Sequence, residues 1–113
     1  MSGAHSRNKG ARFERWVANQ LCDAGFDARR NVRETQLGNS GDIDINAPLV
    51  IQCKRYAKRP PVREAIREAQ EVADRRGFHA IAITRADNDE AMAHMPASDL
   101  FELLRLLRSC GAW

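Results

Sequence analysis

Residues 49 to 84 constrain the fold more than any other part of the chain. An alternating strand pattern over Leu49–Lys54 is followed by a helical pattern over Val62–Arg76 and by a nearly continuous apolar run over Phe78–Thr84. Two strands joined by a crossover helix form a βαβ unit, in which the strands are parallel and helices cover the sheet. The sequence therefore predicts an α/β fold with a mixed β-sheet flanked by helices.

The other segments extend this unit at both ends. We expect a helix over Lys9–Ala24 that ends at a glycine, an edge strand within Phe26–Glu34, a strand over Asp42–Ile45, a short strand over Ala91–Met95 and a last helix capped by Ser98. The core order is α-β-β-β-α-β. At 113 residues the chain fits one domain, residues 1–113, with residues 1–8 as a flexible arm.

Apolar spacing and cysteine usage give further expectations. Phe13, Trp16, Val17 and Leu21 recur at helical intervals, which predicts that Trp16 is a core residue. The three cysteines are widely separated and lack metal-ligand spacing, so we expect reduced and mostly buried thiols. The polar N-terminal residues contain no apolar run, which predicts no signal sequence, no membrane partner and a cytoplasmic protein, in the host cytoplasm if a phage encodes it.

The strands on either side of Asn46-Ala47-Pro48 share one polar face. Alternation places Asp42 and Asp44 on one side of the first strand, and Gln52 and Lys54 on one side of the second. If residues 46–48 form a hairpin loop, all four side chains lie together, in either of two registers. Ordinary polar surface on a half-exposed hairpin is the competing interpretation, with about equal weight.

These residue types suit a hard divalent cation. Mg²⁺ takes one or two carboxylates and fills its other positions with water and phosphate. Asp42 and the helical Glu14 would supply carboxylates, Gln52 a neutral oxygen, and Lys54 an ammonium group beside the metal-activated water. The pattern is suited to phosphodiester hydrolysis.

Two motifs carry a resemblance to a known family. Gly41-Asp42, followed by Gln52-Cys53-Lys54, resembles the P-D…(D/E)-x-K signature of restriction-endonuclease-like nucleases. The stretch from Lys9 to Arg15 is similar to the first helix of archaeal and phage Holliday junction resolvases, and Gln52–Tyr56 is similar to the third motif of Mrr-type restriction endonucleases. The similarity spans Lys9 to about Arg85.

The resemblance implies roles for individual residues. It makes Glu14 and Asp42 metal-site carboxylates, with Asp42 the principal ligand, and Lys54 the catalytic lysine. Gln52 occupies a position that usually holds an acid, which removes one negative charge from the site, and Asp44 is a candidate to compensate for it. The cofactor implied is Mg²⁺, for which Mn²⁺ would substitute.

Charge adds an expectation about the partner. The net charge is +3, from 18 basic and 15 acidic residues, and 15 of the basic residues are arginine, whose fork suits phosphate. A solvated surface is the alternative. The predicted DNA contacts are Arg7, Lys9, Arg12, Arg30, Arg55, Lys58, Arg59 and Arg63.

Together these features predict a Mg²⁺-dependent endonuclease that resolves Holliday junctions or other branched DNA. Resolving one junction takes two incisions, so a chain with a single site would act as a homodimer. The alternatives are an Mrr-like restriction or repair endonuclease, which would cut other double-stranded DNA, and a non-catalytic DNA-binding module, which the neutral Gln52 keeps open.

Overall fold

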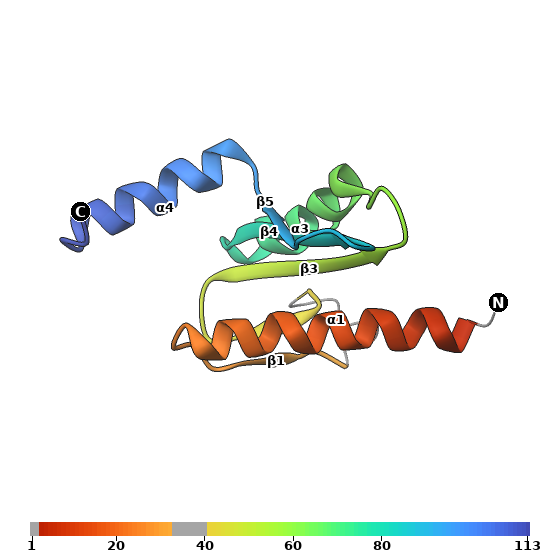
Figure 1. Ribbon diagram of the computed structural model, residues 1–113. Helices are drawn as coiled ribbons and strands as arrows, with labels where there is room; N and C mark the ends of the chain where they lie inside the picture. The colour runs from red at the N-terminus through yellow and green to blue at the C-terminus, as the bar shows by residue number, and fades with distance from the viewer. Residues whose placement is uncertain (1–2, 33–40) are drawn as a thin grey trace.

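Two parallel strands, β3 (Leu49–Tyr56) and β4 (His79–Ala86), organise the fold (Figure 1). The structure is a computed structural model that describes residues 3–32 and 41–113, with side chains described from residue 8 onward. α3 (Val62–Arg76) joins β3 to β4 within the predicted bounds, and β5 (Met92–His94) pairs antiparallel with β4. The βαβ unit and the mixed sheet are confirmed.

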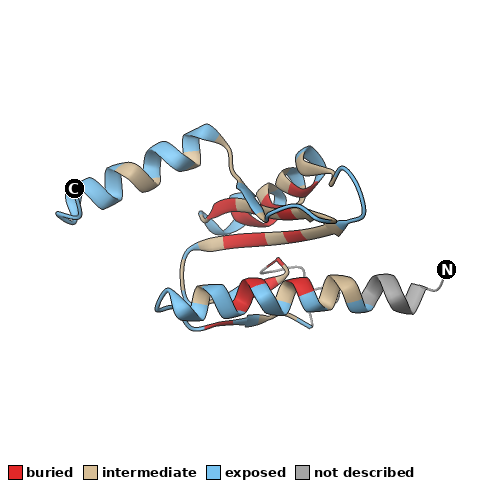
Figure 2. Ribbon diagram, in the orientation of Figure 1, coloured by how far each residue is buried: buried red, intermediate tan, exposed pale blue. Residues whose placement is uncertain are grey.

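Helices cover both faces of β3. α1 (Gly3–Asp23) packs on β3 and on β1 (Ala28–Arg30), whereas α3 packs on β3 and β4. Successive β3 side chains enter different cores: Val50 joins the cluster under α3, and Ile51 joins the cluster under α1. Figure 2 shows buried positions along both strands and on the helix faces that meet them. Both faces of β3 are therefore fixed by packing, which positions its polar side chains.

Two expectations for the first helix are corrected. The helix begins at Gly3 instead of Lys9, so part of the expected arm has helical backbone. Trp16 is 42% exposed and stacks on Phe13, with 5.9 Å between ring centroids. The buried stripe is narrower than predicted: among the described residues, α1 packs mainly on β1 and β3, and Phe13, Val17 and Ala18 are its buried side chains.

The predicted hairpin pairing is wrong. β2 (Ile43–Ile45) does end where the 46–48 turn begins, but it pairs antiparallel with β1, with Asp44 opposite Arg29. The side chain of Asn46 accepts a hydrogen bond from the Asp27 N–H and thereby holds the end of β2 to β1. Among the residues described, no ladder joins β2 to β3: a parallel bridge between Gly41 and Ile51 lies just before β2, and Ile43 packs with Ile51 in one core cluster. The turn thus carries the chain from one small sheet to the other.

The C-terminal helix and the thiols also differ from expectation. α4 (Ala97–Ser109) extends away from the sheet and contains no buried residue (Figures 1 and 2). Its N-cap is Pro96 and not Ser98, because the Pro96 carbonyl accepts the first helical hydrogen bonds, from Asp99 and Leu100. Cys53 is buried, but the other two cysteines are exposed. In the described ranges, no helix combines the length and apolarity needed to cross a bilayer.

Candidate active site

β3 presents Gln52 and Lys54 on the face that α3 covers. Both side chains are partly buried, and they alternate with the buried Ile51 and Cys53, which face α1. The predicted sharing of one face by Gln52 and Lys54 is therefore confirmed, although the partner that meets them comes from a helix and not from β2.

Hydrogen bonds hold Asp42 at the edge of β3. Its Oδ2 accepts from the Cys53 N–H at 2.8 Å, and its own N–H donates to the Ile51 carbonyl at 2.8 Å. The Asn31 N–H donates to the Asp42 carbonyl at 2.9 Å. Gly41, just before it, has a φ of +76° and touches the same stretch of β3. The backbone thus fixes the Asp42 carboxylate beside the strand that carries the lysine.

Glu14 approaches the same place from α1. It follows the buried Phe13 in the helix, its side chain is 21% exposed, and Arg30 Nε donates to its Oε1 at 2.7 Å. Burial first, and then the negative charges of Asp42 and Glu14, raise the pKa of the Cys53 thiol. Because both charges act on one thiol, the two predicted carboxylates gather around the middle of β3.

Two acids, Glu68 on α3 and Asp42 at the edge of β3, act on Lys54. Its Nζ is 3.1 Å from Glu68 Oε2 on α3, and the charge of Asp42 also acts on it. Burial lowers the pKa of Lys54, but the hydrogen bond and charge of Glu68, together with the charge of Asp42, raise it above its ordinary value overall. The lysine is therefore a stable cation beside the carboxylates.

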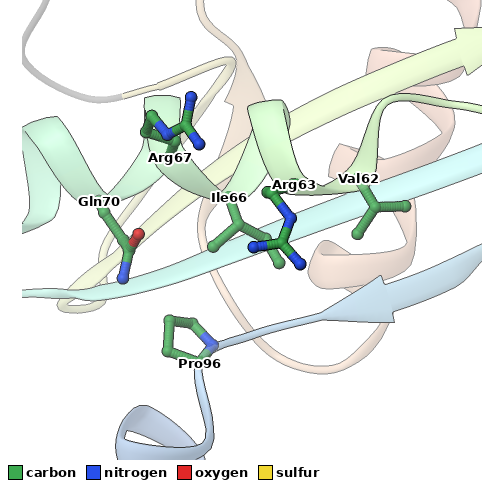
Figure 3. A pocket seen from close by; sticks show the side chains of 6 residues that line it. All are labelled: Val62, Arg63, Ile66, Arg67, Gln70 and Pro96. Atoms are coloured by element: carbon green, nitrogen blue, oxygen red, sulfur yellow. The ribbon is translucent and has the colours of Figure 1, made fainter.

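The structure does not bring Asp44 to this group. Its carboxylate lies 3.4 Å from Arg29 Nε, and half of the side chain is exposed. Gln70, on α3, lines a pocket between α3 and Pro96 with Ile66 and Arg63 (Figure 3). Of the predicted site residues, Asp42 acts by its charge on both Cys53 and Lys54, Glu14 acts on Cys53 from the α1 side, and Gln52 lies beside Gly41 on the α3 side.

Three of the predicted DNA contacts converge near one end of β3. Lys9, Arg12 and Arg55 line a shallow pocket to which Arg85 contributes as well. Arg55 and Arg85 are direct neighbours in the β3–β4 register, and like charges in that position are unfavourable unless they are compensated. Asp87 compensates Arg55, pairing with it at 2.7 Å and also with Lys9 at 3.0 Å, and Arg85 Nε donates to the Asp89 carbonyl at 2.8 Å. The hydrogen bond from Lys9, and then the one from Arg55, lower the pKa of Asp87.

The other predicted contacts are dispersed. Arg30 is engaged with Glu14, and Lys58, Arg59 and Arg63 are exposed on the loop before α3 and on its first turn. The side chain of Arg7 lies outside the described residues. Arg85 was missed because it lies near the end of a mostly apolar strand, directly after the predicted segment; the parallel pairing of β3 and β4 places it opposite Arg55.

One further acidic cluster lies at the other end of the sheet. His79 Nδ1 is 3.3 Å from Asp99 and 3.7 Å from Glu102, and Asp99 also accepts from the Ala80 N–H. These contacts link β4 to the start of α4. His79 and His94 have the strand positions expected for them.

The comparisons with known proteins agree with this geometry. Residues 6–100 match the profile of the Mrr-type catalytic domain, described as a restriction endonuclease. The chain belongs to this restriction endonuclease family. No curated protein matches it. The solved structure of Hjc, a Holliday junction resolvase from Archaeoglobus fulgidus, aligns with a TM-score of 0.59 at 22% identity, covering 77% of this chain and 75% of Hjc. That alignment supports the restriction-endonuclease-like fold.

Membership of this family makes the chain a nuclease and implies a divalent metal ion. The donor set fits such an ion: Asp42 and Glu14 offer two carboxylates and Gln52 a neutral amide oxygen, which are the hard ligands that Mg²⁺ and Mn²⁺ accept.

Proposed function

We propose that this restriction endonuclease family member is a Mg²⁺-dependent DNA endonuclease, with Mn²⁺ able to replace Mg²⁺. The observation that carries the proposal is the position of the Asp42 carboxylate, which the Cys53 N–H holds at the edge of β3. From there its charge acts both on the thiol that Glu14 also reaches and on the Lys54 ammonium. Two acids and a lysine around one strand are the groups that phosphodiester hydrolysis needs.

Each residue has a distinct role in this proposal. Asp42 and Glu14, with the Gln52 amide oxygen, would hold the ion, which when bound activates water and neutralises phosphate charge. Arg30 keeps Glu14 in place through its 2.7 Å bond. The Lys54 ammonium would stabilise the additional negative charge that develops on the phosphate under attack.

The proposed substrate is branched DNA, and the Holliday junction is the first candidate. Two observations support it: the fold is like that of Hjc, a Holliday junction resolvase, and Lys9, Arg12, Arg55 and Arg85 form a basic surface suited to phosphates. Contacts of this kind read backbone position and shape instead of base sequence. Two incisions per junction would require a homodimer with one site in each protomer.

The family match favours a second candidate, a restriction or repair endonuclease that cuts linear duplex DNA. A single assay separates the two. A labelled four-way junction and a linear duplex of the same sequence are mixed with wild-type protein and Mg²⁺, and the initial cutting rates are compared. Faster cutting of the junction supports the resolvase proposal, whereas equal or faster cutting of the duplex supports the second candidate.

The same assay tests whether the chain is a DNA-binding module without catalysis. Binding to the junction without cutting, in Mg²⁺ and in Mn²⁺, would refute the endonuclease proposal. Light scattering of the protein and of its junction complex tests the dimer, which requires two protomers per junction.

A further inference from the structure

The amide of Gln52 has a defined orientation. Its Nε2 donates to Glu68 Oε2 on α3 at 3.0 Å, and its Oε1 faces Gly41, where an ideally placed Cβ would lie 2.9 Å away. The oxygen is thus turned toward the chain segment that carries Asp42. An amide ligand is useful to a cation only through its oxygen, so this orientation decides whether Gln52 can contribute.

Glu68 is the group that selects the orientation. A carboxylate only accepts hydrogen bonds, so the side of the amide that faces Glu68 must be the NH₂ group. The same carboxylate holds Lys54 Nζ, at 3.1 Å from Oε2 and 3.3 Å from Oε1. One acid on the crossover helix therefore contacts both motif residues of β3.

Glu68 also restores charge at the place where the strand motif lacks it. With glutamine at position 52, β3 contributes no carboxylate, and Glu68 is the acid that directly contacts both Gln52 and Lys54. Its side chain is 38% exposed and Lys54 is 22% exposed, so the cluster is partly shielded from water on the α3 side.

We propose that Glu68 is a positioning residue of the metal site: it turns the Gln52 oxygen toward Asp42 and holds Lys54 in place. This inference rests on the proposed function. It assigns to α3 the acid that the family signature places on the strand. Loss of a hydrogen-bonding partner behind a metal ligand typically lowers metal affinity by roughly 10- to 100-fold.

The test is Mn²⁺ binding to the full chain, measured by titration calorimetry without DNA. Glu68→Gln keeps the size of the side chain but can both donate and accept, so Gln52 would lose its fixed orientation. We expect Mn²⁺ affinity to fall by roughly 10- to 100-fold. Glu64→Gln, one turn earlier on the exposed side of α3, is the matched control and should bind as the wild type does.

A double variant provides the second arm. Gln52→Glu with Glu68→Gln exchanges the two side chains and moves the acid onto the strand, with an amide on α3 to donate to it. We expect this exchange to recover the affinity that Glu68→Gln loses. Thermal unfolding, followed by circular dichroism, verifies that each variant is folded. If Glu68→Gln does not fold, the exchange variant is compared with the wild type instead.

The outcomes distinguish this inference from the proposed function. If wild type binds Mn²⁺, Asp42→Asn does not, and Glu68→Gln binds like the wild type, the role of Glu68 is refuted and the nuclease proposal stands. If the exchange variant binds Mn²⁺ as weakly as Glu68→Gln does, the role of Glu68 is also refuted. Wild type that neither binds Mn²⁺ nor cuts DNA would refute both proposals.

Discussion

Gly41 should tolerate no side chain, and Gly41→Ala tests how the structure presents Asp42. An ideal Cβ at this position would lie 2.8 Å from the Ile51 carbonyl oxygen, 2.9 Å from Gln52 Oε1 and 3.0 Å from Val50 Cγ1, and φ is +76°. The left-handed conformation costs a residue with a side chain roughly 1–2 kcal/mol. Overpacking costs about 1–3 kcal/mol more, so we expect the free energy of unfolding to fall by about 2–5 kcal/mol.

Gly77→Ala is the matched control. Gly77 has a similar φ of +67° at the end of α3, but no atom lies within 4 Å of its ideal Cβ. Only the conformational cost of roughly 1–2 kcal/mol applies there. Both variants are unfolded in urea, and unfolding is followed by circular dichroism. The difference between their losses of unfolding free energy is the cost of the clash at position 41. Equal losses would refute the close approach of residue 41 to β3.

Three further predictions concern the groups around the site. Burial, and then nearby acids, raise the pKa of Cys53, so it should resist a thiol reagent at neutral pH while the other two cysteines react; labelling of all three in the native protein would contradict this. The folded pKa of Lys54 lies above its ordinary value of 10.5, so its stabilisation is present below that pH and lost as pH rises through the folded value. Between neutral and high pH, the free energy of unfolding measured in urea should fall more for wild type than for Glu68→Gln. Equal losses would contradict the pairing of Lys54 with Glu68. Arg30→Gln should reduce cutting at least tenfold because it releases Glu14, whereas Arg29→Gln, at an 81% exposed side chain, should have little effect on the rate.

The sequence was sufficient for elements that local patterns determine. α3 has one apolar face and ends at Gly77, which adopts the left-handed conformation of a helix C-cap, and its predicted bounds are those observed. The apolar strand after it pairs parallel with β3 because a crossover helix connects them. Glu14 was predicted to share a site with Asp42, and the charges of both do act on the Cys53 thiol.

What the sequence could not provide was the pairing between distant segments. Alternation assigns the faces of β2 but not its partner, and Asn46 ties β2 to β1 through Asp27. The prediction therefore grouped Asp44 with Asp42, Gln52 and Lys54, whereas it lies opposite Arg29. The same reasoning overlooked Glu68, an acid on the α3 surface.

A signal for Glu68 was nevertheless present. A neutral residue at a motif position that usually holds an acid directs the search for a carboxylate to the neighbouring elements. Glu68 precedes the buried Ala69 on the helix that crosses over β3, so it borders the buried face. Searching that border for an acid would have identified it.

Cutting of a four-way DNA junction by wild type and Asp42→Asn tests the central claim most directly. The claim is that Asp42, held at the edge of β3, is the principal ligand of a catalytic metal ion. We expect wild type to cut with Mg²⁺ and not with EDTA, and Asp42→Asn to bind the junction but not cut it. Asp44→Asn is the control and should cut normally. Cutting by Asp42→Asn at the wild-type rate, or loss of cutting in Asp44→Asn alone, would contradict the account.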